Sequence, residues 1–122
     1  MMSKTIMIVD DAIFMRSFLR DILGKAGYNV VAEAANGLEA VALYEKFKPN
    51  LVTMDITMPE KSGLDALKEI LLSDPTAQVI MCSAMDQHSM VLDALKTGAK
   101  DFVVKPFKPE RMLESVSQVL TN

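Results

Sequence analysis

The 122-residue sequence contains one cysteine, one histidine and no tryptophan. A single cysteine forms no intramolecular disulfide, and the chain lacks the further cysteines and histidines that a structural zinc site requires. Cys82 lies in the apolar run Val79-Ile80-Met81-Cys82, so we expect it to be a small buried hydrophobe. These shortages exclude a disulfide-rich domain and a zinc-binding domain.

The sequence also lacks an excess of basic residues and any long apolar stretch. Its 13 Lys and Arg against 16 Asp and Glu give a formal net charge of -3, with no basic stripe, which argues against nucleic acid as a partner. No apolar run approaches the ~20 residues of a membrane span, and no signal-peptide pattern precedes the first apolar run. We expect a cytoplasmic protein without a membrane partner, forming one domain over residues 1–122 with no room for an output domain.

What the sequence does contain is five short apolar runs, each followed by an amphipathic stretch. This alternation predicts an α/β fold, with a doubly wound five-stranded parallel sheet. The predicted strands are Thr5–Val9, Asn29–Ala34, Leu51–Met54, Gln78–Cys82 and Asp101–Val104. Apolar residues at helical spacing lie between them, and the first four helical stretches stop before Gly27, Pro49, Asp74-Pro75 and Gly98.

Polar residues follow the predicted strands. Asp10 and Asp11 come after the first, Asp55 after the third, Ser83 after the fourth and Lys105 after the fifth. In open parallel sheets, ligands bind outside the carboxyl ends of the strands, so these residues should converge on one rim. Taken alone, the aspartate pair could equally cap the next helix, because Asp is a preferred N-cap residue.

Three carboxylates on one rim would repel one another and raise each other's pKa, unless a divalent cation and a lysine supply compensating charge. Mg²⁺ and Lys105 meet that need, since hard oxygen ligands suit Mg²⁺. Asp55 could then act as a nucleophile toward phosphorus, with Ser83 donating to a phosphoryl oxygen. The alternatives are a solvated loop carboxylate at Asp55, a surface lysine at Lys105 and a turn hydroxyl at Ser83.

The chain resembles the receiver domain of bacterial two-component response regulators over essentially its whole length, and stand-alone chemotaxis regulators most of all. The segments that carry the resemblance are Val9-Asp10-Asp11-Ala12, Phe14-Met15-Arg16, Met54-Asp55-Ile56-Thr57-Met58-Pro59, Gly63, Cys82-Ser83-Ala84-Met85 and Gly98-Ala99-Lys100-Asp101-Phe102-Val103-Val104-Lys105-Pro106-Phe107. The resemblance implies a flavodoxin-like (βα)5 fold with strand order 2-1-3-4-5 and a cis bond between Lys105 and Pro106.

The resemblance also implies the roles of the site residues. Asp55 would accept a phosphoryl group and pair with Lys105, while Mg²⁺ would be held by Asp10, Asp11, Asp55 and the main-chain carbonyl of Thr57. Ser83 would follow the phosphoryl group inward as a switch residue. Phe102 would change rotamer with it, although a core aromatic on a strand is an equally good interpretation of that position. Met85 is a candidate for shielding the phosphoryl group from water.

The implied function is a signalling switch and not an enzyme. The phosphoryl donor would be a separate histidine kinase, because the one histidine, His88, sits where a helix is expected to start. The implied partners are a flagellar motor switch protein and a possible phosphatase, with the chain as a monomer. One alternative is a phosphorelay intermediate. Another is a small aspartyl-phosphate phosphohydrolase, which would need a second aspartate where Thr57 stands. A flavin-binding module is disfavoured, because no phosphate-cradling loop follows the first strand.

Overall fold

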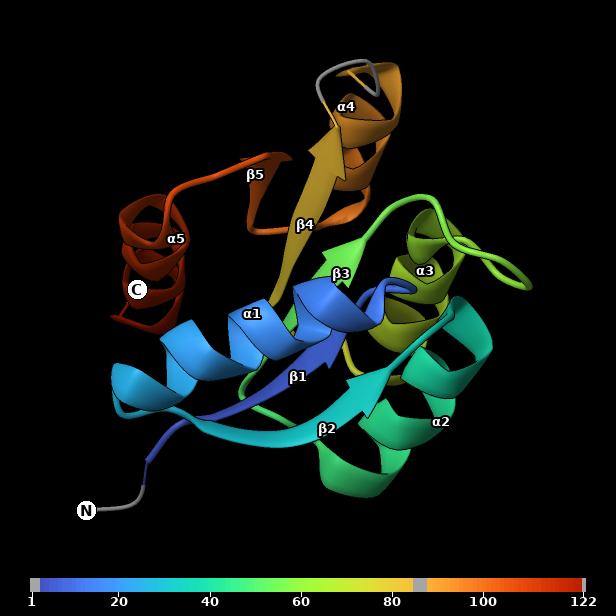
Figure 1. Ribbon diagram of the computed structural model, residues 1–122. Coiled ribbons are helices and arrows are strands. Elements are labelled where there is room, and N and C mark those ends of the chain that lie inside the picture. The colour runs from blue at the N-terminus through green and yellow to red at the C-terminus, as the bar shows by residue number, and fades with distance from the viewer. Residues whose placement is uncertain (1–2, 85–87, 122) are drawn as a thin grey trace.

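The computed structural model describes residues 3–84 and 88–121, which form one parallel sheet covered by helices on both faces (Figure 1). The strand order is β2-β1-β3-β4-β5, so the expected fold class and topology are confirmed. The strands are β1 (Thr5–Val9), β2 (Asn29–Ala34), β3 (Leu51–Asp55), β4 (Val79–Ala84) and β5 (Asp101–Lys105). The helices are α1 (Ile13–Lys25), α2 (Gly37–Phe47), α3 (Gly63–Ser73), α4 (His88–Thr97) and α5 (Pro109–Thr121).

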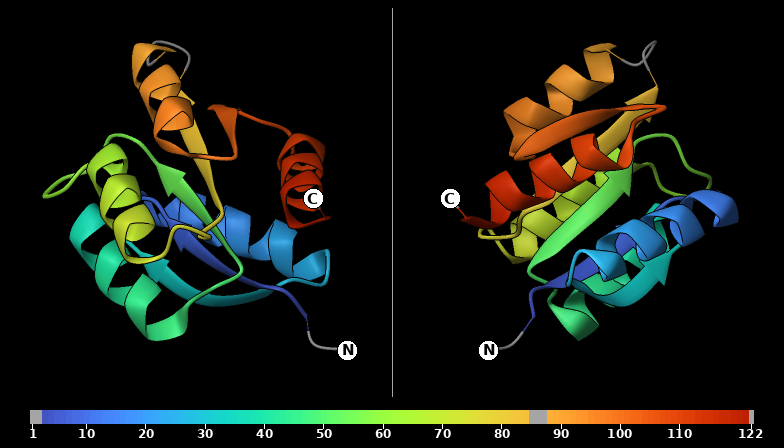
Figure 2. Two further views of the ribbon diagram at one scale, coloured as in Figure 1. Left: turned by 180° about the vertical axis from the view of Figure 1, so that it is seen from behind. Right: turned by 60° about the vertical axis from the view of Figure 1, so that its left-hand side comes forward.

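The helices α1 and α5 cover one face of the sheet, and α2, α3 and α4 cover the other (Figures 1 and 2). Each face has its own apolar cluster. Ile8 of β1 packs in the cluster with Leu19 of α1, whereas its neighbour Met7 belongs to the cluster with Leu67 of α3. Because both faces of the strands are buried, their sequences read as continuous apolar runs. Cys82 lies in the first cluster and is buried, as expected.

Three strands extend further than the apolar pattern predicts. Asp55 and Lys105 are the last residues of β3 and β5, and Ser83 lies within β4, which also begins one residue later than predicted. Backbone pairing continues into these polar residues, with Asp55 opposite Cys82 and Ser83 opposite Val104. The prediction was wrong here because apolar runs report which side chains are buried, not which peptide groups are paired. The sheet itself therefore carries these three side chains.

The loop between β3 and α3 folds back onto the end of β3. The Gly63 N–H donates to the Ile56 carbonyl at 2.7 Å, and a Cβ at Gly63 would collide with the carbonyl oxygen of Asp55. The Ser62 hydroxyl then caps α3 by accepting from the Asp65 N–H at 3.2 Å. Only glycine permits so close an approach of two backbones, so this loop stays tight against the acidic strand end.

Among residues 3–84 and 88–121, no helix has both the length and the apolar character needed to cross a bilayer.

Candidate functional site

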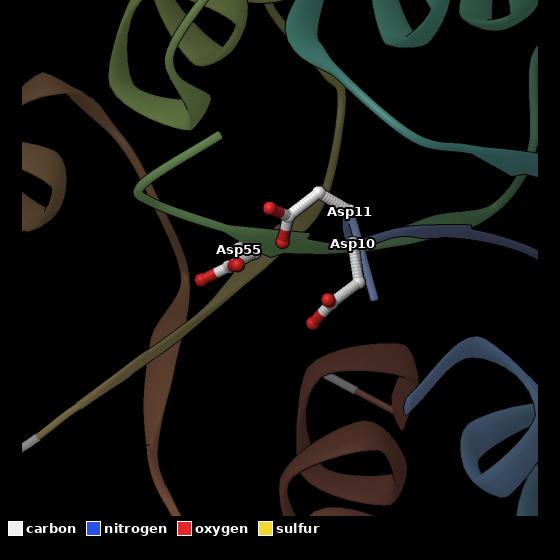
Figure 3. A group of neighbouring side chains, drawn as sticks. All are labelled: Asp10, Asp11 and Asp55. Atoms are coloured by element: carbon white, nitrogen blue, oxygen red, sulfur yellow. The ribbon is translucent and has the colours of Figure 1, made fainter. Parts of the chain in front are cut away.

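Three carboxylates meet at the carboxyl ends of β1 and β3 (Figure 3). Asp10 and Asp11 follow β1, Asp55 ends β3, and one oxygen from each lies within 4.8 Å of the others. Asp10 and Asp55 are only 1% and 8% exposed, whereas Asp11 is open to solvent. The expected convergence of these side chains is confirmed, and the interpretation of Asp55 as a solvated loop carboxylate is wrong.

Asp10 is held in place from several sides. Its N–H donates to the Ala34 carbonyl of β2 at 3.0 Å, and its Oδ1 accepts from the Ala12 N–H at 2.9 Å. The helix α1 has Ala12 as its N-cap, without any side-chain cap. The alternative in which the aspartate pair caps α1 is therefore wrong, because Asp10 bonds to the N–H of the N-cap residue Ala12 and not to an N–H within the helix.

Lys105 reaches from β5 into the acidic group. Its Nζ lies 2.6 Å from Oδ2 of Asp10 and 3.4 Å from Oδ2 of Asp55. Burial lowers the pKa of the lysine, but the hydrogen bond with Asp10 and the negative charges of Asp55 and Asp10 outweigh burial and raise it overall. Lys105 is therefore a half-buried, protonated partner of the carboxylates and not a surface lysine. The Lys105–Pro106 bond is cis, as the resemblance implied.

The Asp55 carboxyl is the group most affected by this arrangement. Burial raises its pKa from the ordinary value of 3.8 to about 6; the charge of Lys105 works against that rise, and the charges of Asp10 and Asp11 add to it. Crowding of the carboxylates was expected to raise the pKa of Asp55, and the direction of this shift is confirmed. The main cause is nevertheless burial, which a sequence pattern reports only indirectly.

The donor set fits Mg²⁺. Three carboxylates offer hard oxygen ligands, and a single ammonium group leaves them with excess negative charge that a divalent cation would offset. An acidic cluster of this kind is typical of the Mg²⁺ sites of receiver domains. Thr57, two residues past Asp55, is exposed in the loop after β3, and the role of its main-chain carbonyl stays a prediction.

Ser83 is fully buried within β4. Within the described part of the chain, its hydroxyl is one of two buried side-chain oxygens without a hydrogen-bond partner, the other belonging to Thr53. A turn hydroxyl would bond to the local backbone, so that alternative is wrong for Ser83. An unpaired buried hydroxyl costs free energy, so its presence in a folded protein calls for an explanation such as a bound water, an ion or a functional role.

Phe102 lies on the edge strand β5, between core and surface. It packs against the apolar cluster under α2, α3 and α4, and it lines a cavity of about 650 Å³ with Phe107 and Arg111. Its carbonyl accepts from Nη2 of Arg111 at 3.0 Å. Met85, proposed as a shield for the phosphoryl group, lies outside the described residues.

Two further residues, to which the sequence patterns assigned no role, link α1 and β2 to the site. Arg16 donates from Nη1 to the Asp10 carbonyl at 2.7 Å, and Glu33 of β2 accepts from Nε of Arg16 at 3.1 Å. The available signal was weak: Glu33 is the one charged residue of β2.

Known proteins resemble this chain in sequence. A family model described as the response regulator receiver domain matches residues 6–117. The chain belongs to this family. Two curated relatives of this receiver domain are both named chemotaxis protein CheY. The one from Thermotoga maritima is 58% identical over 97% of this chain and 98% of the relative, and the one from Bacillus subtilis is 58% identical over 98% and 99%.

A solved structure has the same fold as this receiver domain. A chain in the crystal structure of the CheX-CheY-BeF3-Mg+2 complex from Borrelia burgdorferi superposes with a TM-score of 0.93 at 38% identity, covering 98% of this chain and 90% of that one. The receiver domain is thus closely related to CheY, and it is a signalling domain by family.

Proposed function

We propose that this receiver domain is a phosphoacceptor switch in chemotaxis, in which Asp55 takes a phosphoryl group from a histidine kinase in a Mg²⁺-dependent reaction. The observation that carries the proposal is the placement of the Lys105 ammonium between Asp10 and Asp55, inside a group of three carboxylates. Phosphoryl transfer to a carboxylate requires a positioned nucleophile. It also requires nearby positive charge that offsets the negative charges of the carboxylates and of the phosphoryl group.

The chemistry follows from the side chains. A carboxylate oxygen of Asp55 forms a bond to phosphorus while the bond from phosphorus to the donor's imidazole nitrogen breaks, and its electron pair leaves with the imidazole. Mg²⁺, held by Asp10, Asp11, Asp55 and the Thr57 carbonyl, would neutralise charge on the transferred group. Lys105 is 3.4 Å from Asp55, near enough to pair with a phosphoryl oxygen. Asp55 gains one phosphoryl group, and the resulting aspartyl phosphate is then hydrolysed slowly. The chain is therefore proposed to act as a switch and not as a turnover enzyme.

Two residues are proposed to carry the signal. The unpaired hydroxyl of Ser83 gains a partner when it donates to a phosphoryl oxygen, which favours the phosphorylated arrangement. Phe102 lies beside both the core and a surface cavity, so its ring has room to change rotamer. Movement of Phe102 would then alter the surface formed by α4, β5 and α5.

The partners are inferred from the relatives. Since the similar proteins are named chemotaxis protein CheY, a flagellar motor switch protein is the proposed target, with the chain acting as a cytoplasmic monomer. The related structure from Borrelia burgdorferi holds CheX together with CheY. By analogy, a separate binding protein is a proposed partner of this chain, and a phosphatase is a further proposed partner.

The deciding experiment is intact-protein mass spectrometry after incubation with Mg²⁺ and acetyl phosphate. The wild type should gain one phosphoryl group, Asp55→Asn should gain none, and Asp21→Asn, an exposed carboxylate on α1, should behave as the wild type. An adduct that survives Asp55→Asn refutes the assignment. Rapid repeated hydrolysis of phosphate esters would support the phosphohydrolase instead, and transfer onward to a histidine protein would support the phosphorelay role.

A further inference from the structure

Arg16 joins three elements next to the acidic site. It projects from the first turns of α1, its side chain is only 16% exposed, and its guanidinium contacts both the residue after β1 and the carboxyl-terminal part of β2. Nη1 donates to the Asp10 carbonyl at 2.7 Å, and Nε donates to Oε1 of Glu33 at 3.1 Å. The planar guanidinium suits this double contact, because its donors are fixed relative to one another.

The carbonyl that Arg16 binds belongs to the peptide group between Asp10 and Asp11. The N–H of Asp10 is fixed by β2 and its carboxylate by Ala12 and Lys105. The orientation of the next peptide plane determines the direction in which the side chain of Asp11 leaves the backbone. A hydrogen bond from Arg16 holds that plane, and with it the separation of the two carboxylates.

Glu33 anchors the guanidinium. Its two carboxylate oxygens are divided between two arginines on one face of α1, Oε1 with Arg16 and Oε2 with Nε of Arg20 at 2.5 Å. Among the described residues, Arg20 bonds only to Glu33 and does not share the Asp10 contact, and its side chain is 51% exposed. The two arginines therefore share an anchor but differ in their contact with the site.

We propose that Arg16, held by Glu33, is a positioning residue that orients the Asp10–Asp11 peptide for Mg²⁺ binding and thereby for phosphorylation of Asp55. The inference rests on the proposed function, since it concerns the same site. Residues that orient metal ligands commonly change metal affinity by ~10–100-fold when they are removed. Arg16 acts through the backbone of a ligand and touches neither Mg²⁺ nor phosphate.

The test compares Arg16→Met with Arg20→Met in the full chain. Each substitution removes one ion pair with Glu33, but only the first removes the bond to the Asp10 carbonyl. Mg²⁺ is titrated while backbone amide resonances are followed by NMR. We expect Arg16→Met to raise the Mg²⁺ dissociation constant about tenfold, and Arg20→Met to leave it within about twofold of the wild type, the scatter expected of an exposed ion pair.

A second readout needs no metal. Losing the hydrogen bond to the Asp10 carbonyl should shift the Asp11 amide resonance in Arg16→Met and leave it in place in Arg20→Met. Arg16→Lys should recover part of the Mg²⁺ affinity, because an ammonium can still donate to the carbonyl. If Arg16→Met does not fold, Glu33→Gln tests the anchor and should weaken Mg²⁺ binding in the same direction.

The outcomes separate the inference from the function on which it rests. Equal Mg²⁺ dissociation constants in the wild type, Arg16→Met and Arg20→Met overturn the positioning role while leaving the phosphoacceptor function intact. Equal losses in both arginine variants also overturn it, because a general weakening of the α1–β2 contact would then be the cause. A wild type that binds no Mg²⁺ and gains no phosphoryl group overturns the proposed function together with the inference.

Discussion

The ammonium group of Lys105 lies 2.6 Å from Oδ2 of Asp10 but 3.4 Å from Oδ2 of Asp55. The lysine is thus bonded more closely to a proposed metal ligand than to the proposed phosphoacceptor. The pKa of the acceptor carboxyl accordingly stays raised, because the lysine offsets only part of the effect of burial. Charge brought by Mg²⁺ at Asp10 would leave Lys105 freer to pair with Asp55 and its phosphoryl group.

Replacing this lysine should affect Asp55 directly. In Lys105→Met, the pKa of Asp55 should rise above its value of about 6, because the positive charge that lowers it is gone. Phosphorylation by acetyl phosphate should slow by more than about tenfold, since one compensating charge is missing. Carboxyl carbon NMR titration without Mg²⁺ measures the pKa, with Lys108→Met, an exposed lysine, as the control. Unchanged titration of Asp55 would contradict the assigned contact.

The raised pKa of Asp55 also predicts how stability depends on pH in the absence of metal. Asp55 titrates near 3.8 when unfolded and at about 6 when folded, so in this window the folded chain holds a proton that the unfolded chain has lost. The free energy of unfolding should therefore fall as the pH rises from about 4 to 6, by about 2–3 kcal/mol from this group. Above that window the loss is complete.

Asp55→Asn removes that titration. The variant and the wild type should have nearly equal free energies of unfolding at about pH 4. At about pH 7.5 the variant should be more stable by about 2 kcal/mol, because the amide is never charged. Urea unfolding in EDTA at several pH values measures the difference. A gain that is the same at both ends of the range would show that charge at Asp55 is not its cause.

Replacing Gly63 with alanine is predicted to destabilise the protein, whereas replacing Gly24 with alanine is not. Gly63→Ala should lower the free energy of unfolding by about 1–3 kcal/mol and weaken Mg²⁺ binding, because its Cβ would collide with the Asp55 carbonyl. Gly24 of α1 has nothing within 4 Å of a Cβ, so Gly24→Ala should instead add roughly 0.5–1 kcal/mol. Urea unfolding and Mg²⁺ titration of both variants measure these effects. Similar behaviour of the two would contradict the clash.

Removing a buried hydroxyl should raise or lower the stability of the protein according to whether that hydroxyl is hydrogen-bonded. Thr53→Val should stabilise the chain by about 1 kcal/mol, because the Thr53 hydroxyl is buried without a partner and valine has the same shape. Ser115→Ala should cost about 1 kcal/mol, because the equally buried Ser115 hydroxyl donates to Asp101 at 2.6 Å. Thermal and urea unfolding measure both. A loss in both variants would mean that Thr53 has an unseen partner such as water.

The hydroxyl of Ser83 is predicted to matter only after phosphorylation. Ser83→Ala should leave the unphosphorylated chain at least as stable as the wild type, since no hydrogen bond is lost. On addition of Mg²⁺ and acetyl phosphate, the amide of Phe102 should shift less in Ser83→Ala than in the wild type. Amide NMR spectra measure that shift, with Ser117→Ala, an exposed residue of α5, as the control. Equal shifts would remove Ser83 from the switch.

The sequence by itself determined the alternation of strands and helices, because burial on both faces demands continuous apolar runs and helices demand an apolar stripe. It also placed Asp10, Asp11, Asp55 and Lys105 on one rim, because parallel strands present their carboxyl ends to the same edge. The strand order came from family resemblance, since apolar patterns do not say which strands are neighbours.

Only the tertiary structure decided the contacts that give these residues their properties. Burial of Asp55, the preference of Lys105 for Asp10 and the unpaired state of the Ser83 hydroxyl depend on atoms far away in sequence. Arg16 donates both to the Asp10 carbonyl and to Glu33, which lies seventeen residues further along the chain. Such contacts leave no periodic pattern in the chain, since each depends on how elements far apart in the sequence pack together and not on local spacing.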